Sequence, residues 1–153
     1  MFAKLIPASV LACAIVLTSA ARAAEPSKDE AVQILKDFHA ALKAKDYTKA
    51  ITFLGTPPGV KEGDLQYAAR QFIKNKEISE EGIAILAAKG RWVKLTEGAP
   101  SKIERYTKMW GVKAEECHFL VLGSAEAGFH WDGKVLKIYR CDDIGKLTAD
   151  DAK

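Results

Sequence analysis

The sequence has few of the residues that usually build a chemical site. It contains three cysteines, three histidines and a single asparagine, Asn75, which is not part of a glycosylation sequon. No C-x-x-C, H-x-H or H-x-x-x-H spacing occurs, and there is no G-x-G-x-x-G or phosphate-binding loop. No block of Lys and Arg is interleaved with aromatic residues. The sequence therefore gives no support to a metal site formed by a known motif, to a nucleotide-binding loop or to nucleic-acid binding.

Long apolar runs are also scarce, and the single one lies at the N-terminus. Lys4 precedes an uncharged stretch from Leu5 to Ala21, and Ala21-Arg22-Ala23 places small residues where a signal peptidase reads them. We predict that residues 1–23 are a signal peptide cut between Ala23 and Ala24. The alternatives are a membrane anchor, for which the run is shorter than the about 20 residues needed, and a lipoprotein cut at Cys13, which would leave an apolar tract exposed.

Export would place the mature protein in the periplasm or outside the cell. Lys4 and Arg22 leave with the signal peptide, so 21 of the 23 basic residues remain against 20 acidic ones. We expect residues 24–153 to form a single globular domain, because they match a common domain size and contain no linker or repeat. No second apolar segment is long enough to cross a membrane, so no stable membrane span is expected after cleavage.

Helix signals fill the first half of the mature chain. Ser27 to Glu30 has the pattern of a capping box and precedes an apolar stripe with helical spacing. Further helices are predicted after Asp46, across Leu65–Ile73, from Ser79 to Gly90, and from a second capping box at Ser101–Glu104 to Trp110, closed by Gly111. The pattern of Arg91–Glu97 fits either a strand or a helical turn, and it is left open.

Strand signals fill the last third. Cys117–Leu122, the stretch ending at Trp131, and Val135–Cys141 favour strands, and Asp132-Gly133 is typical of a two-residue hairpin turn. The predicted fold class is α+β, with N-terminal helices packed on a C-terminal three-stranded antiparallel meander. In this order Cys117 and Cys141 lie on the order of 25 Å apart, too far for a disulfide, so two free thiols are expected.

Two segments resemble known groups of proteins. Residues 30–54, EAVQILKDFHAALKAKDYTKAITFL, resemble the opening of the NTF2-like (cystatin-like α+β) superfamily, which implies two helices followed by a curved sheet. That superfamily includes ketosteroid-isomerase-like and dehydratase-like enzymes as well as many binding domains. Residues 128–147, GFHWDGKVLKIYRCDDIGKL, resemble the end of an uncharacterised group of small secreted proteins, which implies no activity.

Three residues are the candidates for acid–base chemistry. Pairing across Asp132-Gly133 places His130 opposite Val135 and on the same face as Glu126 and Tyr139. The alternative, which we favour, is a half-exposed face with solvated polar side chains. His39 is interpreted as a residue that flanks an apolar helix stripe. Asp142-Asp143 is interpreted as an acidic turn whose carboxylates pair with Lys137 and Arg140.

We expect no metal and no cofactor. The possible ligands are His118, His130, Asp132, Asp142 and Asp143, but their spacing is unsuitable and His118 should point to the face opposite His130. The sequence thus favours an exported, non-catalytic binding or accessory domain whose partner is a small molecule or another exported protein. The alternatives are a small acid–base enzyme, isomerase- or dehydratase-like, using His130, and a structural partner in the cell envelope.

Overall fold

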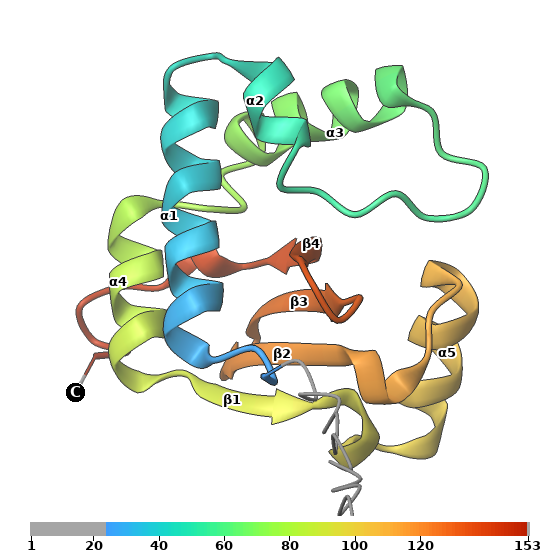
Figure 1. Cartoon of the computed structure of the whole chain (residues 1–153). Helices are drawn as coiled ribbons and strands as arrows, with labels where there is room; N and C mark the ends of the chain where they lie inside the picture. The colour runs from blue at the N-terminus through green and yellow to red at the C-terminus, as the bar shows by residue number, and fades with distance from the viewer. Residues whose placement is uncertain (1–23, 153) are drawn as a thin grey trace, which may run out of the picture.

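Most helices precede the strands along the chain, and one helix lies between the first two strands, in the computed structural model of the protein (Figure 1). The structure describes residues 24–152, so the predicted signal peptide lies outside the described residues. The α+β class predicted from the sequence is confirmed. The helices are α1 (Lys28–Lys43), α2 (Tyr47–Ile51), α3 (Glu62–Lys74), α4 (Glu80–Lys89) and α5 (Pro100–Trp110); the strands are β1 (Arg91–Lys94), β2 (Cys117–Leu122), β3 (Ala125–Trp131) and β4 (Leu136–Asp142); and the short 3-10 turns are η1 (Leu95–Glu97), η2 (Ala114–Glu116) and η3 (Ile144–Lys146).

Side-chain caps fix the starts of three helices where the sequence predicts them. Ser27 Oγ accepts the N–H of Glu30 at 3.2 Å, and Ser79 Oγ accepts the N–H of Gly82 at 3.0 Å. Asp46 caps the short α2 in the same way. The capping box expected at Ser101 is wrong: α5 begins at Pro100, whose fixed φ suits the first helical position and which needs no amide partner.

The sheet has four antiparallel strands in the order β1-β2-β3-β4, one more than the predicted meander. The undecided segment after Gly90 supplies the extra strand, in which Trp92 pairs with Leu120 of β2. At the opposite edge, Ile138 of β4 exchanges backbone hydrogen bonds with Phe53 and Gly55. The connection after α2 therefore covers the β4 edge, whereas β1 is the edge strand on the other side.

The register between β3 and β4 differs from the predicted one by two residues. Trp131 pairs with Leu136, not with Lys134. The reason is that Asp132 Oδ1 accepts the N–H groups of both Lys134 and Val135 at 2.8 Å, which closes a wider turn with Gly133 at φ +93°. The expected two-residue hairpin turn at Asp132-Gly133 is therefore wrong.

A β-bulge further changes which β4 side chains share a face. Phe129 pairs with Ile138 while Gly128 pairs with Arg140, so Tyr139 is an extra residue on β4. Beyond Tyr139 the alternation of β4 is reversed. Cys141 consequently lies on the face opposite His130, although the predicted register placed the two on one face.

The two faces of the sheet carry separate apolar cores. Leu120, Phe129 and Ile138 pack against α1 to α4 in the larger core, whereas Phe119 packs against Tyr106 and Trp110 of α5 in the smaller one. Figure 1 shows α1 and α4 on one side of the sheet and α5 on the other. None of the helices within residues 24–152 combines the length and hydropathy that crossing a bilayer requires.

Cys117 and Cys141 are free and buried. Cys117 belongs to the smaller core and Cys141 to the larger core, so the sheet itself lies between them. Their strands, β2 and β4, are also separated by β3.

Candidate functional site

The structure brings His130 and Tyr139 together and adds a carboxylate that the sequence did not suggest. The two rings meet edge to face with centroids 5.7 Å apart. His130 Nε2 lies 3.1 Å from Glu116 Oε2, and this hydrogen bond lowers the pKa of the Glu116 carboxyl. Glu116 directly precedes β2, and Cys117 pairs with His130 across the sheet, so correct β2–β3 pairing was the signal that could have found it.

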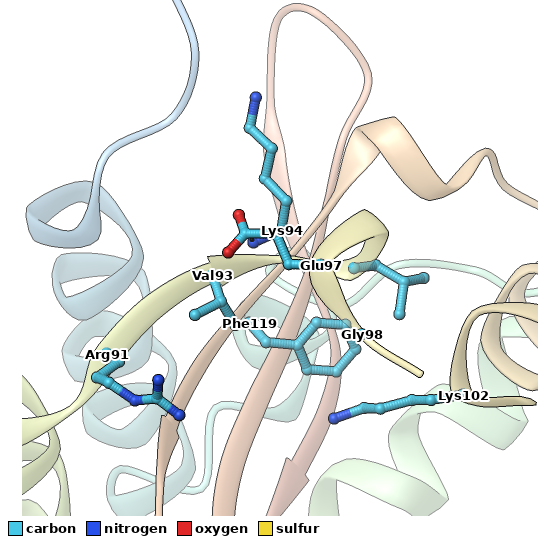
Figure 2. Close-up of a pocket in the computed structure, with 8 residues that line it drawn as sticks. Arg91, Val93, Lys94, Glu97, Gly98, Lys102 and Phe119 are labelled. Atoms are coloured by element: carbon cyan, nitrogen blue, oxygen red, sulfur yellow. Dashed lines mark hydrogen bonds between the residues drawn. The ribbon is translucent and has the colours of Figure 1, made fainter. Parts of the chain in front are cut away.

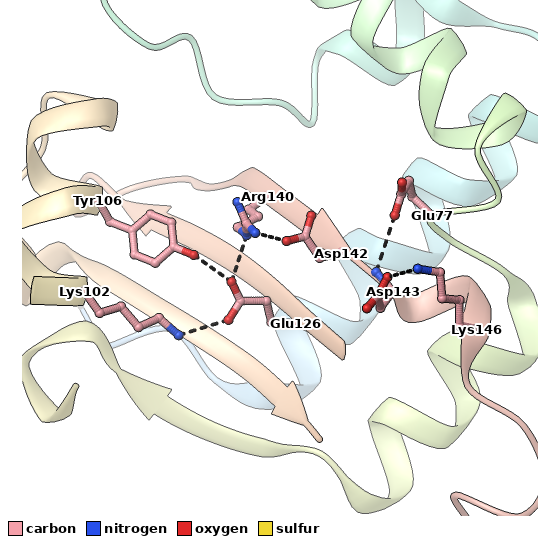
Figure 3. A network of polar contacts seen from close by, with 8 residues as sticks. All are labelled: Glu77, Lys102, Tyr106, Glu126, Arg140, Asp142, Asp143 and Lys146. Carbon is pink, nitrogen blue, oxygen red and sulfur yellow. Dashed lines mark hydrogen bonds and ion pairs between the residues drawn. The ribbon is translucent and has the colours of Figure 1, made fainter. Parts of the chain in front are cut away.

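Glu126 lies in a separate network on the same face of the sheet (Figure 3). Tyr106 donates its hydroxyl to Glu126 Oε1 at 2.8 Å, and Lys102 Nζ donates to Oε2 at 2.9 Å. Arg140 Nε lies 2.8 Å from Oε1, and its guanidinium also pairs with Asp142. Each carboxylate oxygen of Glu126 is thus engaged, and Glu126 is not a free partner for His130.

The network keeps Glu126 charged in a largely buried position. Burial by itself would raise the pKa of Glu126, but the hydrogen bonds from Lys102 and Tyr106 and the nearby positive charges outweigh it, so the pKa is lowered. Tyr106 is affected in the opposite sense, since burial and its hydrogen bond to Glu126 raise the pKa of its hydroxyl. Lys102 and Tyr106 are one turn apart on α5, so the network ties α5 to β3 and fixes the direction of Lys102.

A cleft of about 180 Å³ lies between the β1–η1 segment and α5, beside this network. Phe119 and Val93 form its apolar wall, and Figure 2 shows Arg91 and Lys102 extending their charged ends toward one another beneath the Phe119 ring. Lys102 Nζ lies 4.6 Å from the Phe119 ring centroid. A second hollow, lined by Ser101, Lys102, Arg105 and Tyr106, shares Lys102 with the cleft. Sequence reasoning missed that these two residues line one cleft, because Arg91 and Lys102 come from separate elements.

Comparisons with known proteins do not decide among these sites. No protein family, curated protein or solved structure matches the chain. Function must therefore be inferred from the residues and their geometry.

The remaining candidates named from the sequence are dispersed. His118 lies on the face opposite His130, as expected, although it pairs with Phe129 and not with Trp131. Asp142 pairs with Arg140, as the acidic-turn interpretation expects, while Asp143 pairs with Lys146. Lys137 donates a hydrogen bond to the carbonyl of Thr52, and not to the carboxylates of Asp142 and Asp143. His39 lines a hollow between α1 and α4.

The sites differ in the space that they offer to a ligand. His130 lines neither the cleft nor the neighbouring hollow, and its Nε2 faces Glu116. Tyr139 lines a groove of about 290 Å³ whose other lining residues are mostly apolar, and the one carboxylate there, Asp64, accepts the backbone N–H of Lys61. The cleft beside Phe119 combines space, an apolar wall and two converging cations. Chemically it can hold a small anion with an apolar body.

Proposed function

We propose that this protein is an exported, non-catalytic binding domain that holds a small organic anion in the cleft between β1 and α5. The ligand class is a carboxylate attached to an apolar body. The observation that carries the proposal is the convergence of Arg91 and Lys102 beneath the Phe119 ring (Figure 2).

Three basic side chains and one carboxylate, that of Glu97, line the cleft, so its charge favours an anion. Lys102 is held by Glu126, so its ammonium group is already directed along the cleft and loses little freedom when a ligand binds. Arg91 is exposed on the edge strand, and its guanidinium can form two parallel hydrogen bonds with a carboxylate. Arg105, in the neighbouring hollow, adds a further positive charge next to Lys102.

The wall of the cleft supports an apolar body on the ligand. Phe119 is 1 % exposed and Leu95 is equally buried, so both are held rigidly by the smaller core. Val93 is half-buried beside them. A cleft of about 180 Å³ is smaller than the pockets that hold drug-sized ligands, which restricts the ligand to a small molecule.

Binding of phenylacetate and butyrate, measured by calorimetry and by amide chemical shifts, tests this proposal. We expect both anions to shift the resonances of Val93 and Phe119, while benzyl alcohol and butanol bind far more weakly. Arg91→Gln should weaken binding by about tenfold through loss of a charge-assisted pair. Lys108→Gln, which removes the same charge from an exposed position on α5, is the matched control and should change nothing.

Equal affinity of the alcohols and the carboxylates would contradict the proposal, as would an Arg91→Gln variant that binds like the unaltered protein. Lys102→Gln is less informative as a first variant, because it also removes a partner of Glu126. Its folded state must first be verified by circular dichroism.

The exported location rests on the predicted cleavage between Ala23 and Ala24. Intact-mass analysis of protein recovered outside the cytoplasm is expected to give a chain that starts at Ala24. An acylated N-terminus at Cys13, or a chain that retains residues 1–23, would contradict it.

An acid–base enzyme is the second candidate, supported by the 3.1 Å contact between His130 and Glu116 and by the adjacent Tyr139 ring. It ranks lower because His130 is 16 % exposed in its side chain and already paired. The relationship to the NTF2-like superfamily stays a prediction.

A further inference from the structure

A second cavity lies on the other face of the sheet, at the end where α1 begins and the β3–β4 turn closes. Its volume is about 340 Å³. The wall comes from five separate parts of the chain: the segment before α1, the end of β1, η2, β2, and the end of β3 with its turn. The side chains that matter here are Glu25, Glu115, Glu116, His118, Trp131 and Asp132.

His118 is the unusual residue of this cavity. It is 2 % exposed; the backbone carbonyl of Glu116 lies near its ring, but neither ring nitrogen forms a hydrogen bond of good geometry within residues 24–152. Its ring stacks on Trp92, with centroids 5.2 Å apart and an angle of 11° between the planes. Burial, aided by the charge of Lys94, lowers its pKa, so the ring is neutral near pH 7 and carries one nitrogen that can accept a hydrogen bond. A buried polar group left without a partner is costly, which makes a donor from outside the chain chemically favourable here.

The charges around the cavity are mostly negative. Four carboxylates line it, and Lys94 is the basic side chain among the lining residues, with its Nζ 2.7 Å from Glu25 Oε1. Hydrogen bonds from the backbone of Val135 and Lys134 lower the pKa of Asp132, and the contact with His130 lowers that of Glu116, so both are ionised near neutral pH. The excess of negative charge favours a cationic ligand.

The arrangement suits an organic cation better than a metal ion. Within the described part of the chain, no three His, Cys, Asp or Glu side chains are close enough together to hold a metal. The carboxylates instead surround a cavity with room for a carbon body, and the half-buried Trp131 supplies an aromatic wall. Aromatic rings and carboxylates together are the groups that recognise ammonium ions.

We propose that this cavity binds a small organic amine, whose ammonium group lies among the carboxylates of Glu115 and Asp132 and donates a hydrogen bond to His118. The site is distinct from the anion cleft, since it lies on the opposite face of the sheet and attracts the opposite charge. It shares one lining residue with that cleft, Lys94, whose ammonium group is turned away from Arg91 and Lys102 (Figure 2).

Titration with n-butylammonium chloride, followed by long-range proton–nitrogen spectra of the imidazole groups, tests the assignment. We expect saturable shifts of the His118 nitrogens, with those of His39 and His130 unchanged. n-Butanol, which has the same chain and no charge, is expected to give no saturable shift. Saturable binding of n-butanol with an affinity equal to that of n-butylammonium would overturn the proposal.

Two charge-removing substitutions locate the site. Asp132→Asn keeps an oxygen that can accept the N–H groups of Lys134 and Val135, so the turn is preserved. Combined with Glu115→Gln, it should weaken n-butylammonium binding by about tenfold or more. Glu104→Gln, on the exposed surface of α5, is the matched control and should leave the affinity unchanged. Unaltered affinity in the double variant would overturn the assignment.

His118→Phe separates the role of the ring nitrogens from that of the ring shape. Phenylalanine can keep the stacking on Trp92 while removing both unpartnered nitrogens, so the variant should fold with an equal or higher melting temperature and lose n-butylammonium affinity. Undiminished affinity, or competition by Zn²⁺ or Ca²⁺ at micromolar concentration, would overturn the amine assignment. Neither outcome bears on phenylacetate binding at the anion cleft, so failure of one proposal is distinguishable from failure of the other.

Discussion

Gly128 of β3 lies directly against the indole ring of Trp110. A Cβ placed on Gly128 would be 2.7 Å from Trp110 Cη2 and 2.9 Å from Phe119 Cε1, both closer than atoms can pack. The missing side chain therefore allows α5 to approach the sheet and form the smaller core. That core supplies the Phe119 wall of the anion cleft and positions Lys102.

Gly128→Ala should lower the free energy of unfolding by about 1–3 kcal/mol, because a buried methyl group would force Trp110 and Phe119 apart. Chemical denaturation monitored by tryptophan fluorescence measures the change. Gly63→Ala is the matched control: a Cβ there meets no atom within 4 Å, and alanine in α3 should be neutral or stabilising by up to about 1 kcal/mol. Equal effects of the two substitutions would refute the close-packing explanation.

Gly133→Val should destabilise the fold by about 1–3 kcal/mol, because Gly133 has φ +93° and a β-branched residue tolerates positive φ poorly. Lys134→Val places the same side chain on the next, exposed residue of the turn, where φ is not positive, and should change stability by less than about 0.5 kcal/mol. Thermal melts of both variants decide the matter. A Gly133→Val protein as stable as the Lys134→Val protein would show that the turn adopts another conformation.

In protein that lacks residues 1–23, Cys117 and Cys141 should both be unreactive in the folded state and fully reactive after denaturation. Burial raises the pKa of Cys117 and of Cys141 to about 12, so almost no thiolate exists at pH 8, and the sheet separates the two residues. Counting with a chromogenic thiol reagent checks this: two thiols are expected in denatured, unreduced protein and rapid reaction of neither in native protein. A count of zero after denaturation would reveal a disulfide and a different strand arrangement.

Glu126→Gln should lower the free energy of unfolding at pH 7 by about 1–3 kcal/mol, because it leaves Lys102 without its charged partner and Arg140 with Asp142 alone. The folded-state pKa of Glu126 is below its usual value of 4.5, so its contribution is fully present above that pH. The contribution is lost as the pH falls from 4.5 through the folded-state pKa.

The pH dependence of the difference in unfolding free energy between the unaltered protein and Glu126→Gln tests this explanation. The gap in stability between the unaltered protein and Glu126→Gln should shrink steadily as the pH falls below 4.5, as measured by denaturation at a series of pH values. Glu104→Gln, at an exposed position, should show no such gap at any pH. A gap that persists unchanged at pH 3 would mean that the loss comes from packing and not from the charge of Glu126.

Local signals in the sequence determined which segments become helices and most of the strands. Two kinds of signal act within one or two turns of helix and can therefore be recognised in the sequence. They are the caps at Ser27, Asp46 and Ser79 and the apolar stripe through Leu35 and Phe38. The α+β class follows from their order. The alternation in β2 likewise separated His118 from Cys117 onto opposite faces.

The tertiary structure determined the register of the strands and which residues come together in each site. The Asp132 carboxylate closes a wider turn than the residue pair Asp132-Gly133 predicts. The extra residue Tyr139 reverses the alternation of β4. Contacts across the sheet, and not local preference, determine the width of the turn and the position of the bulge. Arg91 and Lys102 line one cleft for the same reason: α5 can pack on the sheet where Gly128 leaves room for Trp110. The apolar pattern of the chain is compatible with several registers, and packing against two helical layers selects one of them.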